Sequence, residues 1–279
     1  MLLRFTKMHG LGNDFVMLDL ISQQTQLSQK LITRLADRRL GIGFDQLLTI
    51  GPPDDPDLDF KYNIYNADGS EAEQCGNGAR CALHFVRDQK LTDKTQIRLG
   101  TINGTLDCQL KKDGNVTVDL GPPLLAPSMI PFLADAEATS YQVTLPSDEG
   151  KSLCLTAINV GNPHAVITVE DVRRAPVQEV GSVMECHPRF PERVNVGFME
   201  VVSRQAIKLR VFERGLGETR ACGSGACAAV VAGRLQGKLD EEVDVELPGG
   251  LLKVSWAGDG ANIMMTGPAC RVYEGQVQL

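Results

Sequence analysis

The chain lacks a basic charge excess, a long apolar run and a secretory leader. Its 28 Lys and Arg residues are outnumbered by 35 Asp and Glu residues, which gives a formal net charge of −7, unlike the basic surface of a nucleic-acid-binding protein. No apolar run reaches the ~18 residues of a membrane span. The opening MLLRFTKMHGLGND lacks the apolar core and cleavage site of a signal peptide. We therefore expect a cytoplasmic protein that binds neither nucleic acid nor membrane.

Cofactor and metal motifs are missing as well. There is no P-loop, and GLGND (residues 10–14) is neither a GxGxxG fingerprint nor set between a strand and a helix. No lysine has a local context that suggests a Schiff base. The cysteine pairs 75/81 and 222/227 are six and five residues apart, and neither spacing is the CxxC of zinc sites. We expect no cofactor and no metal.

Eight cysteines in 279 residues are too few for a disulfide scaffold, so free thiols are expected in a reducing compartment. Cys81 and Cys227 fall inside predicted helices, where we expect them to pack. The other cysteines outside the motifs described below stand in unrelated contexts, and we expect small buried hydrophobic residues there. These are Cys108, Cys154, Cys186 and Cys270.

The chain does contain an internal repeat. Shifted by 147 positions, IYNADGSEAEQCGNGARCAL (residues 64–83) aligns without a gap on VFERGLGETRACGSGACAAV, and Cys75 meets Cys222. At an offset of 149, Asn13 meets Asn162 and Gln46 meets Asn195. Three landmarks in the same order predict two similar halves. Their boundary is expected in or just after a proline-rich stretch at residues 121–132.

Hydrophobic periodicity predicts a β-rich chain with few helices. The expected strands are FVMLDL, QLLTI, FKYNIYN, TQIRL, NVTVDL, HAVITV, NVGFMEVV, AIKLRVFE and VDVEL. The expected helices lie within residues 28–39, with Ser28 as N-cap, and within residues 76–90 and 223–238. We therefore predict an α+β fold of two pseudo-symmetric domains, each a curved sheet around a central helix, with the active site in the cleft between them. The predicted domains are residues 1–125, on which the last C-terminal residues could also pack, and residues 126–279.

Each Cys-Gly-x-Gly motif is predicted to open a helix, which suggests acid–base chemistry. Unpaired N–H groups at a helix start bind anions, and the helix dipole lowers the pKa of a cysteine placed there. If Cys75 and Cys222 flank the α-carbon of a bound amino acid, one thiolate removes its proton and the other thiol protonates the opposite face. The helix-start donors would hold the carboxylate and stabilise its developing charge. Two opposed thiols predict inversion of a stereocentre.

Other polar residues lie near the repeat landmarks. His164 and Glu213 are placed to influence thiol protonation, although packing or capping remains an alternative for His164. Glu213 and Arg214 form either a simple salt bridge or a site for an ammonium and a carboxylate. Amides suit a zwitterion because they both donate and accept, although each is also a common turn residue. The candidate amides are Asn13, Gln46, Asn66, Asn162 and Asn195.

Six segments together closely resemble the diaminopimelate epimerase family over essentially the whole chain. They are KMHGLGNDF, GFDQ, YNADGSEAEQCGNGARC, NVGNPHAV, RVNVGF and ERGLGETRACGSGACA. The resemblance implies barrel-like sheets, Cys75 and Cys222 as the acid–base pair, and thiol tuning by His164 and Glu213. It implies that the substrate carboxylate binds near Gly76, Asn77, Gly223 and Ser224. It assigns Asn13, Gln46, Asn66, Asn162, Asn195, Glu213 and Arg214 to substrate binding. It also implies a homodimer with Tyr273 near the contact, and diaminopimelate as substrate.

Two alternatives remain open from the residues alone. The cysteine motif by itself would also fit an isomerase or racemase of proline or a related small acid. A thiol protein without catalytic activity would instead use a disulfide between Cys75 and Cys222 as its functional event. Turnover distinguishes these alternatives, whereas oxidation alone does not.

Overall fold

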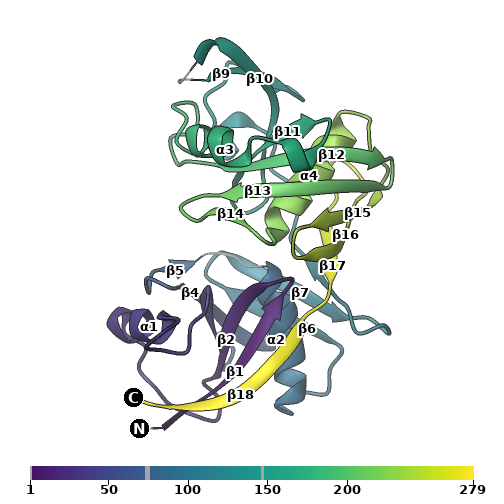
Figure 1. Ribbon diagram of the computed structural model, residues 1–279. Coiled ribbons are helices and arrows are strands. Elements are labelled where there is room, and N and C mark those ends of the chain that lie inside the picture. Colours follow the sequence, from purple (N-terminus) through teal and green to yellow (C-terminus); the bar gives the residue numbers. More distant parts are fainter. Residues whose placement is uncertain (1, 73–75, 146–147) are drawn as a thin grey trace. The chain divides into compact units, whose positions relative to one another are not determined.

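The computed structural model describes residues 2–72, 76–145 and 148–279, and the chain divides into two compact units. The first unit comprises residues 1–119 and 266–279, and the second comprises residues 120–265. These boundaries differ from the predicted 1–125 and 126–279. The first unit needs the C-terminal strand because that strand pairs with the N-terminal one from Leu2 to His9 (Figure 1).

The first unit is a curved, mostly antiparallel sheet with two helices. Its elements are β1 (Leu2–Gly10), β2 (Asn13–Asp19), α1 (Gln29–Ala36), β3 (Gln46–Gly51), β4 (Phe60–Asn66), β5 (Glu71–Ala72), α2 (Gly76–Asp88), β6 (Gln96–Thr101), β7 (Gly104–Leu110), β8 (Val116–Asp119) and β18 (Cys270–Gln278). The strands pair in the order β18-β1-β2-β3-β4-β6-β7-β8, and β5 adds to β4. Among the described strand pairs of this unit, only β2–β3 and β4–β6 are parallel.

The second unit repeats this plan. Its elements are η1 (Pro127–Met129), β9 (Tyr141–Leu145), β10 (Asp148–Asn159), β11 (Pro163–Val169), η2 (Val172–Arg174), α3 (Val177–Glu185), β12 (Asn195–Ser203), β13 (Ala206–Glu213), β14 (Gly217–Thr219), α4 (Gly223–Leu235), β15 (Glu242–Leu247), β16 (Gly250–Trp256) and the start of β17 (Ile263–Gly267). The strands pair in the order β9-β10-β11-β12-β13-β15-β16, with β14 added to β13. The parallel pairs, β11–β12 and β13–β15, are the counterparts of those in the first unit.

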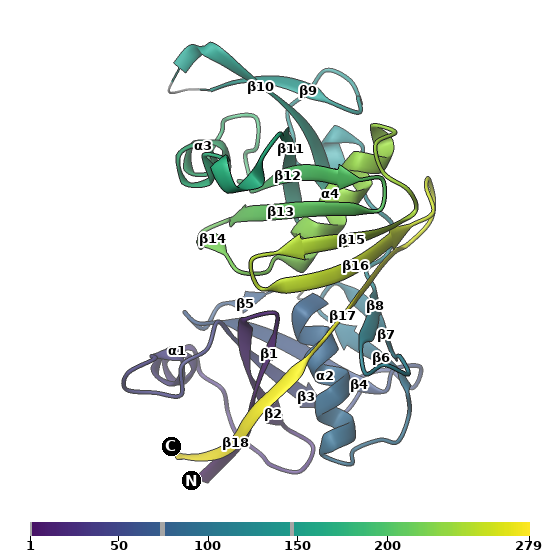
Figure 2. The ribbon, with the colours of Figure 1, turned by 45° about the vertical axis from the view of Figure 1, so that its right-hand side comes forward.

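The helices α2 and α4 are the central helices of their units (Figure 2). The helix α2 contacts β1, β2, β3, β7, β8 and β18, and α4 contacts β10, β11, β12, β13 and β16. Nine residues of α2 and ten of α4 are buried, as expected for helices enclosed by a sheet rather than lying on its surface. Gly233 of α4 permits this packing, because a Cβ there would lie 2.2 Å from Cδ1 of Leu239. The predicted α+β fold of two similar halves, each built on a central helix, is confirmed.

The sequence predicted most of the elements near the repeat but missed others. All nine expected strands and all three expected helices are present, and Ser28 caps α1 by accepting a hydrogen bond of 3.2 Å from the Leu31 N–H. The helix α3 was missed because Gly181 interrupts its apolar stripe of Val177, Val180 and Met184. A Cβ at Gly181 would lie 2.6 Å from Phe212, so the glycine allows α3 to approach β13 closely.

Candidate functional site

Three predicted substrate-binding amides of the first unit lie along one edge of its sheet. Asn13 begins β2, Gln46 begins β3 and Asn66 ends β4. Because β2 and β3 are parallel and β4 is antiparallel to β3, these positions share an edge. Gln46 lies opposite Asn66, and its Nε2 donates a hydrogen bond of 3.0 Å to the Asn66 Oδ1. The Asn66 Nδ2 donates to Oγ of Ser70 at 3.1 Å, so both ends of the Asn66 amide are held.

The start of α2 adjoins this edge through Asn77. The Asn77 side chain is buried, and its Nδ2 donates to Oδ1 of Asn13 at 3.3 Å. Gly10 allows β1 to pass close to α2, since a Cβ there would lie 3.0 Å from NH2 of Arg80. Gly76 is the first residue of the helix. Cys75, predicted as one of the two catalytic thiols, lies outside the described residues.

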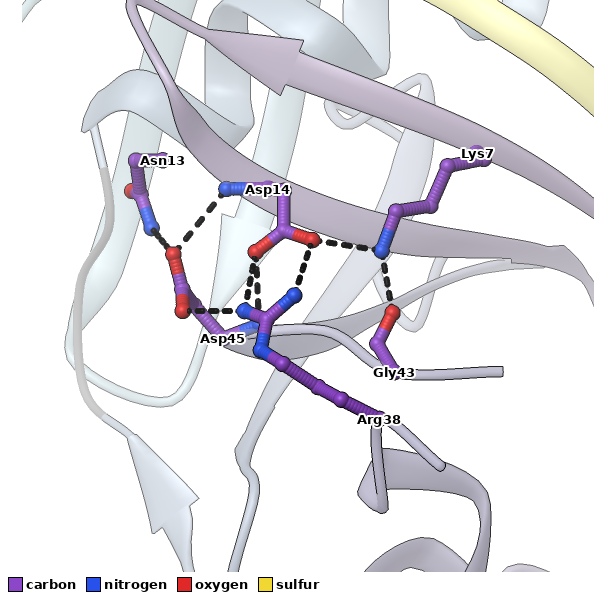
Figure 3. A network of polar contacts seen from close by, with 6 residues as sticks. All are labelled: Lys7, Asn13, Asp14, Arg38, Gly43 and Asp45. Atoms are coloured by element: carbon purple, nitrogen blue, oxygen red, sulfur yellow. Dashed lines mark hydrogen bonds and ion pairs between the residues drawn. The ribbon is translucent and has the colours of Figure 1, made fainter. Parts of the chain in front are cut away.

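Asn13 is held on its other side by a network of charged side chains (Figure 3). Its Nδ2 donates to Oδ2 of Asp45 at 3.0 Å, and the same oxygen accepts from the backbone N–H of Asp14 at 3.1 Å. Arg38 bridges the two carboxylates, with hydrogen bonds of 2.9 and 2.7 Å to Asp14 and one of 2.8 Å to Asp45. Lys7 completes the network with an ion pair of 2.6 Å to Asp14.

The charges of this network balance, with two cations and two anions in contact. Lys7 is buried and also donates to the carbonyl oxygen of Gly43. Burial alone would raise the pKa of Asp14, but hydrogen bonds from Arg38 and Lys7 outweigh it and hold that pKa well below its usual value. Asp14 is therefore ionised at neutral pH, and the guanidinium and ammonium groups offset its charge.

In the second unit, the corresponding strand ends carry Asn162, Asn195 and Glu213. Asn162 precedes β11, Asn195 begins β12 and Glu213 ends β13. The buried Asn195 donates through Nδ2 to the Pro163 carbonyl oxygen at 3.0 Å. Its Oδ1 accepts from the backbone N–H of Arg214 at 2.9 Å. Asn195 therefore fixes the chain that presents Arg214, and its own amide is engaged with backbone at both ends.

His164 lies beside Asn162 and is fully buried. Its Nε2 is 2.8 Å from Oδ1 of Asn162, and its Nδ1 has no hydrogen-bond partner within the described residues. A buried N–H without a partner is rarer than a buried acceptor without one, so the proton belongs on Nε2, which donates to Asn162. Burial, reinforced by the nearby Arg214 guanidinium, lowers the pKa of His164 to about 3. His164 is thus a neutral ring that orients Asn162.

Cys222 is the N-cap residue of α4 and is buried. Its Sγ accepts a hydrogen bond of 3.4 Å from the Gly225 N–H and lies 3.6 Å from the Ser224 hydroxyl. Gly223 is the first helical residue and is also buried. A Cβ at Gly225 would lie 3.2 Å from the sulfur, so this glycine leaves space for the thiol. The predicted thiol, Gly223 and Ser224 therefore lie together at the helix start.

The expected lowering of the Cys222 pKa is wrong. Burial raises the pKa of the Cys222 thiol well above its usual value, and the Glu213 carboxylate raises it further through its charge and a hydrogen bond. Donors from Ser224 and Gly225 act in the opposite direction but are outweighed. Cys222 is consequently protonated at neutral pH.

Glu213 meets Cys222 because of its place in the β13–β14 hairpin. Val211 pairs with Thr219, and Glu213 pairs with Gly217, so Val211, Glu213 and Thr219 share one face of the hairpin. This face is turned toward the start of α4, since a Cβ on Gly225 would lie 2.9 Å from Val211. The Thr219 hydroxyl donates to Oε1 of Glu213. Thr219 therefore orients the carboxylate that acts on the thiol.

Arg214 lies at the turn that follows β13. It is exposed, and its NH1 donates to the Glu192 carbonyl oxygen at 2.9 Å. The next residue, Gly215, donates through its backbone N–H to Oε1 of the buried Glu185 at 2.7 Å. Glu185 also pairs with Arg193 at 3.5 Å. These contacts fix the turn on which Arg214 is presented.

Three supporting residues could hardly be recognised from the sequence. Asp45 stands within GFDQ beside Gln46, but its contact with Asn13 joins residues 32 positions apart. Thr219 precedes the second cysteine motif, and its match in the repeat is Ala72, so the repeat does not mark it. Glu185 belongs to the helix that the sequence did not predict. Only the register of the strands would have identified Thr219.

The remaining cysteines are not all buried as expected. Cys81, Cys108 and Cys227 are buried, whereas Cys154 and Cys270 on strands and Cys186 after α3 are exposed. Cys154 and Cys270 occupy outward-facing or edge positions of their strands. The sequence around a single cysteine does not show which way its side chain faces. Within the described parts of the chain there is no group of three or more His, Cys, Asp or Glu residues arranged to hold a metal ion. No described helix is long and apolar enough to cross a membrane.

Curated relatives are similar over the full length of the chain. The pattern of the diaminopimelate epimerase family matches residues 5–126 and 156–272. Diaminopimelate epimerases of Stutzerimonas stutzeri and Pseudomonas aeruginosa are each 56% identical, and that of Azotobacter vinelandii is 57% identical, over 279 residues covering 100% of both chains.

Solved structures with the same fold are more distant in sequence. A probable proline racemase from Agrobacterium radiobacter, solved with bound carbonate, has a TM-score of 0.73 at 16% identity, covering 99% of this chain and 93% of that one. A hydroxyproline epimerase from Agrobacterium vitis, solved with bound trans-4-hydroxy-L-proline, has a TM-score of 0.69 at 16% identity, covering 99% and 92%. A Bacillus anthracis protein of the PhzF phenazine-biosynthesis family has a TM-score of 0.67 at 15% identity, covering 100% of both. These likenesses support the α+β fold.

Proposed function

This chain belongs to the diaminopimelate epimerase family, and we propose that it interconverts LL- and meso-2,6-diaminopimelate without a cofactor, by proton transfer to and from two cysteines. The isomerase activity belongs to lysine biosynthesis. In the proposed mechanism one thiolate removes the α-proton and the opposite thiol protonates the other face of the carbon. The mechanism requires Cys75 and Cys222 to reach the same bound substrate.

The contacts of Cys222 are the observation that carries this mechanism. The thiol is protonated because burial and Glu213 raise its pKa, so it serves as the acid that delivers a proton. For the reverse reaction, Glu213 receives the thiol proton, and the resulting thiolate is stabilised by the Gly225 N–H and the Ser224 hydroxyl. Thr219 holds Glu213 in place during this exchange.

Cys75 is the proposed second thiol. In sequence it immediately precedes α2, which begins at Gly76, as Cys222 immediately precedes α4, which begins at Gly223. The ungapped repeat at an offset of 147 supports equivalent roles for the two. The same motifs support binding of the reacting carboxylate by backbone donors near Gly76, Asn77, Gly223 and Ser224.

Polar side chains at the sheet edges are proposed to bind the rest of the substrate. Diaminopimelate has two amino-acid ends, each with an ammonium and a carboxylate, and amides, a carboxylate and a guanidinium together match those groups. His164 is proposed to act through Asn162, whose amide it orients. The proposed binding residues are Asn13, Gln46, Asn66, Asn162, Asn195, Glu213 and Arg214.

Proton NMR in deuterated buffer tests the mechanism directly. The reduced protein, with no added cofactor, is offered LL-diaminopimelate, L-proline and L-glutamate, and loss of the α-proton and change of configuration are followed. We expect exchange with inversion of diaminopimelate alone. Exchange of proline instead would retain the chemistry and contradict the substrate. No exchange with any of the three, with free thiols intact, would favour a thiol protein without catalytic activity.

We propose that the active protein is a cytoplasmic homodimer. Tyr273 lies on β18, most of whose residues are exposed, and is itself 46% exposed with its ring 6.0 Å from that of Phe5. An exposed aromatic side chain on a strand suits a contact with a second copy. The seven free cysteines of the described chain suit a reducing compartment. Sedimentation of wild type and Tyr273→Ala tests the dimer, and a monomeric wild type would exclude it.

A further inference from the structure

The contacts of Asn13 distinguish the two ends of its amide. An ionised carboxylate can only accept hydrogen bonds, so the contact of 3.0 Å with Asp45 requires the nitrogen of Asn13 to face that side chain. The oxygen of Asn13 then faces the start of α2, where it accepts from Asn77. One N–H and one oxygen lone pair of Asn13 remain available to a ligand.

Asp45 is itself held in a fixed orientation. Arg38 donates to its Oδ1 at 2.8 Å, and the Asp14 N–H donates to its Oδ2 at 3.1 Å. The backbone N–H of Asp45 donates to the Asp14 carbonyl oxygen at 3.0 Å. The Asp45 side chain is 44% exposed, so these contacts, rather than surrounding packing, hold the carboxylate against Asn13 (Figure 3).

We propose that Asp45, supported by Arg38, is a positioning residue for substrate binding, which fixes the amide of Asn13 so that its oxygen meets the ammonium of an amino-acid end of the substrate. This inference rests on the proposed role of Asn13. Without Asp45, the Asn13 amide keeps the contact of 3.3 Å with Asn77, whose own amide can turn over with it. Asn13 can then present its nitrogen, a donor, where the substrate also has a donor. The substrate then binds less tightly, both in the ground state and in the transition state.

In the second unit, too, a separate side chain orients the asparagine. There, the residue two positions after the asparagine is His164, which orients Asn162 through its ring. The matching residue of the first unit is Phe15, which is fully buried and has no hydrogen-bonding side-chain group. An anchor for the nitrogen of Asn13 must therefore come from elsewhere in the chain, and Asp45 supplies it.

A double-mutant cycle tests the proposal. We compare wild type, Asp45→Ala, Asn13→Ala and the double variant in steady-state epimerisation of LL-diaminopimelate. We expect Asp45→Ala to raise KM about tenfold and to change kcat less than about threefold, because the lost contact affects ground-state and transition-state binding alike. The double variant should match Asn13→Ala within about twofold, since Asp45 acts only through Asn13.

The matched control is Asp54→Ala, which removes another aspartate of the first unit from an ion pair, its contact of 2.6 Å with Lys61. It should leave KM unchanged. If Asp45→Ala does not fold, Arg38→Met replaces it as the test variant. The Arg38 side chain is 57% exposed, so its replacement should disturb the fold less. It should raise KM about threefold in the wild-type background and not at all with Asn13→Ala.

Two outcomes overturn the inference while leaving the proposed function intact. One is a double variant whose losses multiply to about a hundredfold, which would make Asp45 independent of Asn13. The other is a wild-type KM in Asp45→Ala while Asn13→Ala is impaired. An inactive wild-type protein would instead contradict the proposed function itself.

Discussion

Asn13 of the first unit and Asn162 of the second stand at matching points of the repeat and are held by different means. Asn13 gives its nitrogen to the carboxylate of Asp45, within a network of four charged side chains. Asn162 gives its oxygen to the imidazole of His164, a neutral and fully buried ring. Asp45 therefore anchors the nitrogen of its asparagine and His164 anchors the oxygen, while the oxygen of Asn13 also accepts from Asn77.

The difference shows how a duplicated fold can bind two chemically distinct groups. The backbone places an asparagine at the same strand start in both units, and the neighbouring residues decide which end of its amide is presented. The charged anchor is partly open to solvent, with Arg38 57% exposed, so it responds to ionic strength. The buried imidazole instead makes the free energy of unfolding depend on pH, because folding lowers its pKa.

The largest expected effect comes from removing the thiol of the second unit. Cys222→Ala should lower kcat by about a thousandfold or more, because no other described group replaces the acid at the start of α4. Cys154→Ala is the control, since that cysteine is exposed and outside the site. Epimerisation rates are measured from both substrate isomers. A Cys222→Ala variant with near-normal rates would contradict the two-thiol mechanism.

Acid pH should destabilise the protein through His164. Its pKa is about 3 in the folded chain against an ordinary 6.5, so the unfolded chain binds the proton first. The stabilising contribution is present above pH 6.5 and is lost as the pH falls toward 3. Between pH 7 and 5 the loss is about 2 kcal/mol.

The measurement is urea unfolding of wild type and His164→Gln at pH 7, 6 and 5. Glutamine does not titrate. Between pH 7 and 5 the free energy of unfolding of His164→Gln should therefore fall by about 2 kcal/mol less than that of wild type. Parallel pH dependences in the two proteins would show that His164 does not remain neutral in the folded state.

Substitutions of Thr219 test whether its hydrogen bond to Glu213 contributes to proton exchange at Cys222. Thr219→Val keeps the shape of the side chain but removes the hydroxyl that donates to Glu213. We expect kcat to fall about tenfold with little change in KM, because the carboxylate that exchanges a proton with Cys222 is no longer oriented. Thr219→Ser should restore most of the rate. Equal losses in the Val and Ser variants would point to packing rather than to the hydroxyl.

Salt should produce the smallest effect, and only in the first unit. Raising the ionic strength from about 0.05 to 0.5 M screens the partly exposed pairs of Arg38. The KM ratio of Arg38→Met to wild type should therefore narrow by about twofold, since the wild type loses part of its anchor. A ratio that does not change with salt would mean that the Arg38 pairs do not contribute to binding.

Local patterns and the repeat allowed much of this architecture to be predicted. The glycine-rich motifs identified both central helices because glycines at a helix start are a local signal, and the ordered landmarks identified two similar halves. The substrate-binding role of the amides could be suggested because they lie beside those landmarks. The strand β18 was not identified as a strand, because its pairing with β1 joins opposite ends of the chain.

The chemistry of the site was harder to predict than its position. The Cys222 pKa was expected to be lowered by the helix start, which is visible in the sequence. It is instead raised by burial and by Glu213, which depend on how β13 packs against α4. Likewise, the matching positions Phe15 and His164 could be aligned, but only the contacts of Asp45 show what replaces the ring.

The pairing of β18 with β1 has a consequence for how the protein is made. The second unit is continuous in sequence, from residue 120 to 265, whereas the first is completed only by residues 266–279. Synthesis therefore completes the sequence of the second unit before that of the first, whose edge strand β1 lacks its partner until residues 266–279 have been made. The domain that is begun first is finished last, and its sheet closes only when β18 pairs with β1.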